Sequence, residues 1–239
     1  MLRELIDKFY LEREREKKER ERVQFYISEV GKCPRSIFFK FKKAPAKEIE
    51  AERLRIFDHG DFIHRMILNP LFSFGIVTAS EISIPPQEII AGRADAIVSL
   101  NGEQYVLDVK SISGKMNFEK MEKPMPEHFW QVQLYLHYFR IKKGILLYVN
   151  KDTQELKEFV FDYQEEVVKE LLEWFQKLKK KIESNRVPQR IPDYPDNWQC
   201  KSCQFREICE IVGEGEMDWE NFKKKMETAE FALQKRGSD

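Results

Sequence analysis

An acidic and a basic residue stand two positions apart near the end of an apolar segment. Asp108 and Lys110 belong to the stretch YVLDVK, whose other residues suit a buried strand. On a β-strand, residues two apart point to the same face of the sheet. Such a pair could be a simple ion pair. It could also act on a phosphate ester, with the acid holding a metal ion and the base stabilising negative charge.

The dipeptide Asn101-Gly102 predicts how this strand pairs with the one before it. Asn-Gly is typical of a type I′ hairpin turn, which needs positive φ at both central residues. With these two residues at the turn, Asp95 lies directly opposite Asp108. The other face of the hairpin is then apolar and should pack on a helix; it comprises Ala94, Ala96, Val98, Tyr105, Leu107 and Val109.

Two carboxylates opposite one another in a sheet repel, because their Cβ atoms are only about 5 Å apart. Arg93 and Lys110 could compensate this repulsion as ion pairs on a polar sheet face. Alternatively, a hard cation such as Mg²⁺ or Mn²⁺ could take oxygen ligands from Asp95, Asp108 and the carbonyl of Val109. The geometry favours the metal site, and Lys110 would then stand beside it.

The four cysteines show a three-plus-one spacing. Cys200, Cys203 and Cys209 form Cys-x2-Cys-x5-Cys near the end of the chain, and Cys33 lies far upstream. Reduced, buried thiols are one interpretation, but close cysteine spacing usually marks a metal site. Structural zinc usually takes its ligands in two close pairs, whereas four thiolates also suit an iron–sulfur cluster. The spacing therefore favours a cluster that joins the two ends of the domain.

The order of predicted elements indicates an α/β fold with a mixed central sheet. Hydrophobic residues make up 42% of the 239 residues and aromatic residues 13%, enough for a sizeable core. We predict helices at 1–22, 35–42, 52–68, 127–141, 163–184 and 217–235, and strands at 75–84, 89–100, 104–111, 144–150 and 155–162.

Charge and hydropathy bound the class of protein. The chain has 41 basic residues (Lys and Arg) and 41 acidic residues (Asp and Glu), so its net charge is near zero. A surface that binds nucleic acid would therefore have to be locally basic. Arg35 is one candidate for a phosphate contact, and Glu81 is a possible further acid on the first strand. No apolar run approaches the length of a membrane span, and the first residues lack a signal-peptide core. We therefore expect a cytoplasmic protein with no membrane partner.

Several of these motifs, taken in order, resemble a known family. Asp95 followed by Asp108-Val109-Lys110 resembles the D…(D/E)-x-K core of the PD-(D/E)XK nucleases. The segment QVQLY resembles the Gln-x-x-x-Tyr motif of RecB-type members, and GDFIHRMI resembles their upstream histidine segment. SEVGKCPRSIFF with CKSCQFREIC resembles the frame of the iron–sulfur Cas-four family of CRISPR-associated nucleases, and AddB-type repair nucleases carry a similar frame. The resemblance covers residues from about 28 to 209.

The resemblance implies a restriction-endonuclease-like core, flanked by helices, with a helical, iron–sulfur-bound N- and C-terminal region. The implied division is an N-terminal helix at 1–27, a nuclease core at 28–185 and a cluster-binding region at 186–239, closed by Cys33. A 4Fe–4S cluster is favoured over a 2Fe–2S cluster. The implied site residues are the metal ligands His64, Asp95, Asp108 and Val109, and the catalytic residues Asp95, Asp108, Lys110, Gln131 and Tyr135.

The implied activity is metal-dependent cleavage of DNA at single strands or ends, with Mn²⁺ or Mg²⁺. The resemblance also implies a role in CRISPR spacer acquisition beside integrase proteins. A free-standing repair or mobile-element nuclease and a non-catalytic DNA-binding subunit are the alternatives, and the oligomeric state is open. The loop 113–127, which combines lysines with Met116 and Phe118, could cover a single strand or be an ordinary loop packed by its own apolar residues.

Overall fold

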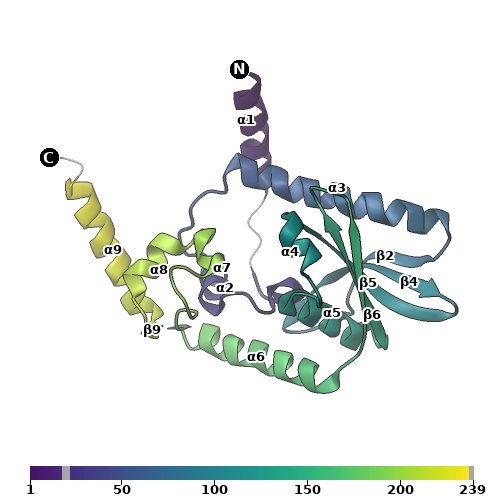
Figure 1. The fold of residues 1–239 in the computed structure, drawn as a ribbon. Helices are drawn as coiled ribbons and strands as arrows, with labels where there is room; N and C mark the ends of the chain where they lie inside the picture. Colours follow the sequence, from purple (N-terminus) through teal and green to yellow (C-terminus); the bar gives the residue numbers. More distant parts are fainter. Residues whose placement is uncertain (18–21, 237–239) are drawn as a thin grey trace. The chain divides into compact units, whose positions relative to one another are not determined.

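The computed structural model describes residues 1–17 and 22–236. The chain divides into two compact units. The first contains the described parts of 1–19, 24–31 and 50–172, and the second those of 20–23, 32–49 and 173–239. Figure 1 labels the elements of both. No helix in the described ranges is both long and apolar enough to cross a membrane.

The first unit is built on a five-stranded sheet in the order β2-β4-β5-β6-β7. Its strands are β2 (Val77–Ser83), β4 (Arg93–Leu100), β5 (Glu103–Ile112), β6 (Lys143–Asn150) and β7 (Leu156–Asp162). Strands β5 and β6 are parallel and all other neighbours are antiparallel. The predicted mixed central sheet is therefore confirmed.

The hairpin between β4 and β5 has the predicted register. Leu100 pairs with Glu103, and the ladder continues in step to Ala96 opposite Leu107. Asn101 and Gly102 have φ values of 53° and 81°, the positive values that a type I′ turn needs. One step beyond the ladder, the same register brings Asp95 level with Asp108.

Helix α3 (Ala51–Ser73) covers the apolar face of this hairpin. Ile63 and Leu68 of the helix pack against a group of buried strand residues, which comprises Ala96, Val98, Leu107, Val109, Ile145 and Val149. The helix is longer than the predicted 52–68, because it continues past Pro70 for one more turn. The last turn of the helix is completed by a hydrogen bond from the backbone N–H of Phe74 to the Pro70 carbonyl.

Helix α5 (Pro126–Phe139) covers the opposite face of the sheet. It begins with Pro126 in its first turn, where a missing N–H costs nothing, and ends at Arg140 in the left-handed conformation. A Cβ added to Gly144 would lie 2.7 Å from Val132, so glycine lets the helix approach β6 closely. The polar face of the hairpin is therefore buried under a helix, and Asp108 is only 1% exposed.

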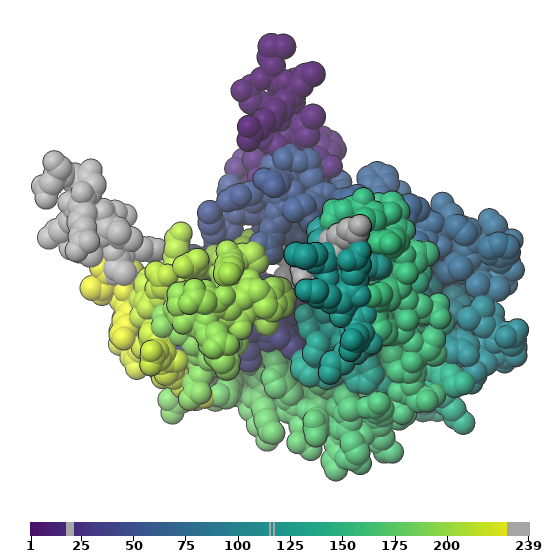
Figure 2. Space-filling view, viewed as in Figure 1, coloured from purple at the N-terminus to yellow at the C-terminus, as the bar shows by residue number. Residues whose placement is uncertain are grey.

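Helix α1 (Leu2–Arg15) packs on α3, and every one of its residues is at least partly exposed. The pair is held by Arg13, whose Nη2 lies 2.7 Å from Asp58 Oδ1, and by an ion pair between Arg55 and Asp7. Figure 2 shows α1 projecting beyond α3. The helix ends before the predicted residue 22, and residues 18–21 of that prediction lie outside the described residues.

Short elements complete the first unit. Strand β1 (Phe25–Tyr26) pairs in parallel with β3 (Ile90–Ala91) and leads into a 3-10 turn, η1 (Ile27–Glu29). The predicted loop 113–127 contains a short helix, α4 (Lys115–Glu119). Lys157 Nζ donates to the carbonyl oxygens of Phe118 and Met121 at 2.6 and 3.0 Å. That contact stabilises the end of α4, where unpaired carbonyls carry negative charge.

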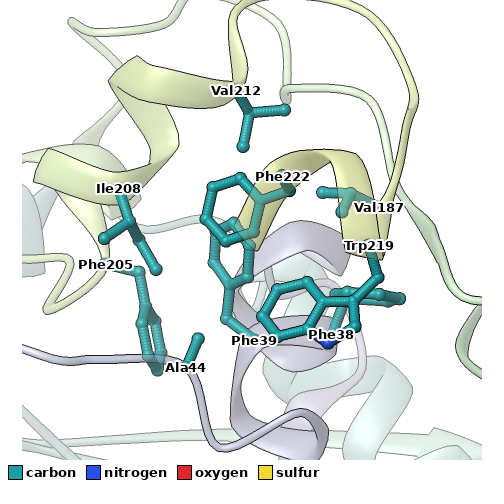
Figure 3. Packing of buried hydrophobic residues seen from close by; sticks show 9 residues of the cluster. All are labelled: Phe38, Phe39, Ala44, Val187, Phe205, Ile208, Val212, Trp219 and Phe222. Atoms are coloured by element: carbon teal, nitrogen blue, oxygen red, sulfur yellow. The ribbon is translucent and has the colours of Figure 1, made fainter. Parts of the chain in front are cut away.

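The second unit gathers short helices around an aromatic core. Its elements are α2 (Pro34–Phe41), the later part of α6 (Glu165–Glu183), α7 (Trp198–Lys201), α8 (Arg206–Val212), α9 (Trp219–Arg236) and the strand pair β8 (Arg186–Val187) and β9 (Met217–Asp218). Figure 3 shows the core, which comprises Phe38, Phe39, Ala44, Val187, Phe205, Ile208, Val212, Trp219 and Phe222. Cys203 and Cys209 pack against it.

Candidate active site and cysteine cluster

Asp108 lies near the end of β5 beneath α5, with two different surroundings for its two oxygens. Its Oδ1 accepts a hydrogen bond of 3.3 Å from Gln131 Nε2. Its Oδ2 is buried and lies 2.7 Å from Lys110 Nζ, an ion-pair contact without hydrogen-bond geometry. Burial, which outweighs the effect of Lys110, raises the pKa of Asp108 to about 6, and the negative charge of Asp95 adds to this rise.

Asp95, at the start of β4, is held in the charged form instead. Its Oδ2 accepts a 2.7 Å hydrogen bond from the backbone N–H of Val109, and its Oδ1 lies 3.4 Å from His64 Nδ1. Burial alone would raise the pKa of Asp95. His64, Lys110 and the Val109 N–H together lower it. The hydrogen bond to Asp95 in turn raises the pKa of His64, which is partly buried at this side of α3.

Helix α5 brings two polar side chains to the same place, because Gln131 and Tyr135 are one turn apart on one face. Gln131 Nε2 lies 3.4 Å from the Tyr135 hydroxyl in addition to its contact with Asp108. The Tyr135 hydroxyl donates to the Arg93 carbonyl at 2.8 Å. Burial raises the pKa of Tyr135, and the charge of Asp108 adds to it, so the phenol stays neutral.

The first unit thus brings together all the predicted side chains of this site. His64 comes from α3, Asp95 from β4, Asp108 and Lys110 from β5, and Gln131 and Tyr135 from α5. No three His, Cys, Asp or Glu side chains in the described part of the chain surround one metal position. The donor chemistry nevertheless fits a hard cation, because Asp108 Oδ2 is a buried carboxylate oxygen without a hydrogen bond.

Three side chains proposed from the sequence have other roles in the structure. Glu81 lies level with Asp95 on β2, but its Oε2 is 2.7 Å from Arg93 Nη2. Arg93 therefore pairs with Glu81, and the alternative in which it compensates the two aspartates is not what the structure shows. Arg35, one candidate for a phosphate contact, is only 1% exposed and donates to the carbonyls of Pro188 and Gly213 instead.

Sequence reasoning missed one polar side chain beside the site. Tyr148 of β6 pairs in register with Lys110 and is fully buried. Its hydroxyl accepts from the Met125 N–H at 3.1 Å and lies 2.9 Å from His128 Nδ1. Burial raises the pKa of Tyr148, and Asp108 adds to the rise. A polar ring inside the otherwise apolar strand GILLYV was the signal that could have revealed it.

The four cysteines belong to the second unit. Cys33 stands at the start of α2, Cys200 lies in α7, Cys209 lies in α8, and Cys203 lies between α7 and α8. The backbone N–H of Cys33 donates to Gln199 Oε1 at 2.7 Å, which ties the upstream cysteine to the C-terminal segment. Cys200 is buried and the other three are partly buried.

The electrostatics of these thiols fit a bound cationic group. Burial raises the pKa of the Cys33 thiol, and negative charge on Cys203 and Cys209 raises it further. Burial also raises the pKa of the Cys200 thiol, and negative charge on Cys203 and Cys209 raises it further. The four thiols therefore belong to one electrostatically connected group within the second unit.

Comparison with known proteins then places the chain in a family. The model of the PD-(D/E)XK nuclease superfamily matches residues 8–210. The chain belongs to the PD-(D/E)XK nuclease superfamily. It is therefore a nuclease, a hydrolase of phosphodiester bonds, and nucleases of this superfamily use divalent metal ions. The match includes every site residue described above, from Cys33 to Cys209.

Individual relatives agree with this assignment. The chain is 27% identical over 199 residues to the CRISPR-associated exonuclease Cas4 of Saccharolobus solfataricus, covering 80% of this chain and 89% of the relative. It resembles the crystal structure of SSO0001 with a TM-score of 0.59 and 25% identity, covering 87% and 96% of the two chains. The structure of LHK-Exo in complex with dAMP shares the fold, with a TM-score of 0.51, 12% identity and coverage of 75% and 92%.

Proposed function

We propose that this PD-(D/E)XK nuclease is a metal-dependent DNA exonuclease that acts on single strands or on DNA ends. The observation that carries the proposal is the meeting of Asp95, Asp108 and Lys110 at one end of the sheet, with Lys110 Nζ 2.7 Å from Asp108. Two acids whose pKa values are driven apart, beside a fixed cation, are the groups that phosphodiester hydrolysis needs.

Each residue has a role that follows from its contacts. Asp95, Asp108 and the Val109 carbonyl, with His64 at the edge, would hold Mn²⁺ or Mg²⁺, which supplies Lewis-acid polarisation of the phosphate when bound. Lys110 stabilises negative charge that develops on the phosphate in the transition state. Gln131 orients Asp108 through its hydrogen bond, and Tyr135 fixes Gln131 against the Arg93 backbone.

We propose that Cys33, Cys200, Cys203 and Cys209 hold an iron–sulfur cluster, of the 4Fe–4S type. The support is their electrostatic coupling within one unit and the absence of any other cysteine in the chain. The group would supply folding energy by joining Cys33 to the C-terminal segment. Protein purified without oxygen should be brown and contain iron and acid-labile sulfide, whereas colourless protein with one zinc ion per chain would contradict the proposal.

The relative named as a CRISPR-associated exonuclease supports a role in processing spacer precursors. We propose integrase proteins of a CRISPR system as partners, and a basic groove as the DNA contact. Affinity for DNA should then fall steeply as salt rises, because phosphate contacts release counterions. A pull-down that recovers no integrase protein would favour a free-standing nuclease instead.

The central experiment is cleavage of end-labelled single- and double-stranded DNA with and without Mn²⁺. The wild type should shorten the DNA only with the metal, and Asp108→Ala should abolish cleavage. Glu103→Gln is a matched control, because Glu103 is an exposed acid at the other end of β5, paired with Lys143. If Asp108→Ala cuts as fast as the wild type, the assignment of the active site is wrong.

A further inference from the structure

Arg35 is a buried cation that has no acidic partner in the described part of the chain. It lies in the first turn of α2 and is only 1% exposed. Its guanidinium makes five hydrogen bonds, and none of the five acceptors is a carboxylate. Because an ionised group loses its water on burial, an uncompensated positive charge at this position would destabilise the fold.

Four of the acceptors are backbone carbonyls in the segments that follow β8 and α8. They belong to Pro188, Gly213, Glu214 and Gly215, at donor–acceptor distances of 2.8, 2.9, 3.3 and 2.9 Å. These neutral groups satisfy the donors of the guanidinium but bring no full negative charge. They hold the guanidinium in one orientation, in which its remaining contact is with a sulfur.

The fifth acceptor is the side chain of Cys209. Nη1 of Arg35 donates to Cys209 Sγ at 3.3 Å. Of the five acceptors, this sulfur alone can carry a full negative charge, as a thiolate bound to a metal. Cys209 is partly buried against the aromatic core of the second unit, where charges are screened less than in water. A thiolate at Cys209 therefore supplies the anion that the burial of Arg35 requires.

The helix turn that carries Arg35 also adjoins another of the cysteines. Cys33 stands immediately before α2, and Arg35 is the second residue of the helix. The hydrogen bond from Arg35 therefore joins the segment of Cys33 to Cys209, which is 174 residues after Arg35 in the chain. Because the chain itself makes this contact, it preorganises the two segments for a shared metal centre.

A four-thiolate site has a use for such a cation. Four thiolates carry more negative charge than either a zinc ion or a 4Fe–4S core offsets. Net charge and hydrogen bonds to the sulfurs are two of the factors that set the reduction potential of a cluster. Contacts to the ligands from the surrounding protein also tune how tightly a site holds its metal.

We propose that Arg35 is the charge partner of the four-cysteine site, where it keeps Cys209 on the metal and raises the reduction potential of the cluster. The inference rests on the proposed iron–sulfur cluster and adds to it a positioning residue that is not a ligand. Arg35 acts through the sulfur of Cys209, by its hydrogen bond and by its charge. The segment from Cys33 to Arg35 thus provides a ligand and a counter-charge from one helix turn.

The first test measures how fast the full chain releases its metal to a metallochromic chelator without oxygen. Arg35→Gln removes the charge and should release the metal about 10-fold to about 150-fold faster than the wild type, the range for losing one hydrogen bond to a charged group. Arg35→Lys keeps the charge and should retain most of the protection. If both variants release the metal equally fast, or if Arg35→Gln releases it as slowly as the wild type, Arg35 is not the charge partner.

Lys42→Gln is the matched control for the loss of a positive charge. Lys42 is a partly buried cation at the other end of α2, where its Nζ donates to Asn185 Oδ1. Among the described residues it has no contact with a sulfur, so this variant should release the metal at the wild-type rate. Release as fast as that of Arg35→Gln would show that any cation of α2 has the same effect, and the specific role of Arg35 would then be wrong.

The reduction potential separates an effect of charge from an effect on folding. It is measured on protein that has kept its cluster, so it does not depend on how much of the protein folds. The potential should be more negative in Arg35→Gln than in the wild type, and Arg35→Lys should lie closer to the wild type. Lys42→Gln should leave the potential unchanged. Equal potentials in the wild type and in Arg35→Gln would contradict the proposal.

Two cysteine variants test the same contact without a change at Arg35, in case Arg35→Gln does not fold. Cys203 and Cys209 are both partly buried against the aromatic core, but of these two only Cys209 accepts from Arg35 in the described structure. In EDTA, Cys209→Ala should unfold at a lower urea concentration than Cys203→Ala, because it leaves Arg35 buried without its sulfur. An equal or reversed order of the two midpoints would count against the contact.

The metal content of the wild type distinguishes these failures from failure of the proposed cluster. A wild type that contains iron and sulfide, but whose metal release and potential do not change in Arg35→Gln, retains the cluster and loses the charge partner. A wild type that contains zinc, released faster in Arg35→Gln, loses the cluster and retains Arg35 as the partner of the four thiolates. A wild type that binds neither metal overturns both.

Discussion

Replacing Asp108 by Asn should stabilise the metal-free protein at neutral pH. Asn keeps the shape of the side chain and resembles the protonated acid. Burial raises the pKa of Asp108 from its ordinary value of 3.8 to about 6. Each tenfold change in acid strength corresponds to about 1.4 kcal/mol, so keeping this carboxylate charged in the fold costs about 3 kcal/mol at pH 7 or above.

The sign of the pH dependence follows from proton linkage. Between about pH 4 and pH 6 the folded protein holds a proton on Asp108 that the unfolded chain has lost. This group therefore lowers the free energy of unfolding as the pH rises through that window. Asp108→Asn removes the effect, so its gain in stability should be about 3 kcal/mol at pH 8 and close to zero at pH 4.

Urea unfolding in EDTA at both pH values measures these gains. Asp95→Asn is the matched control with the opposite sign, because His64 and Lys110 keep the pKa of Asp95 low. That variant should lose stability at pH 8. Mn²⁺ should stabilise the wild type more than Asp108→Asn, because a cation that binds the folded state shifts the equilibrium toward it. An Asp108→Asn protein that is less stable than the wild type at pH 8 in EDTA would refute the reasoning.

Three further predictions follow from single contacts. Lys110→Ala should lose most of the cleavage rate but keep metal binding, measured by titration calorimetry, because it removes charge stabilisation and no ligand. Arg35→Met should lower the free energy of unfolding by about 3 kcal/mol, measured in urea, because buried backbone carbonyls lose the guanidinium that donates to them. Arg190 donates to the Cys209 carbonyl, and Arg190→Met should lower the free energy of unfolding by less. Lys157→Met should speed hydrogen exchange in α4 while global stability falls by only about 1 kcal/mol.

The hairpin that carries the acids could be predicted because its information is local. Asn101-Gly102 dictates the turn, and the side-chain period of two then assigns every residue to a face. The meeting of Asp95 with the Val109 N–H follows from the same register. The placement of Gln131 over Asp108 did not follow, because it depends on how close α5 comes to β6, and that distance is controlled by Gly144.

The sequence did not predict the short helices whose stability comes from contacts with distant parts of the chain. Helix α4 has only five residues and is completed by Lys157 from β7. Helices α7 and α8 are also too short for a periodic pattern, and their aromatic core is shared with α2 and α9. Arg35 was interpreted as a surface cation because the sequence does not show its acceptors, such as the carbonyl of Pro188, 153 residues away.

Helix α5 explains why an acid with an unfavourable charge is retained in the core. The helix excludes water from Asp108 and so raises the energy of its carboxylate, while Gln131 satisfies one of its oxygens and leaves the other without a hydrogen bond. A fully satisfied carboxylate would bind a cation weakly, and an exposed one would be screened by water. In Asp108 one oxygen accepts from Gln131 and the other lies beside Lys110 without a hydrogen bond, so a divalent ion bound there would stabilise a carboxylate that burial destabilises. Under the proposed function, the instability of the metal-free site and its affinity for metal would then have the same cause.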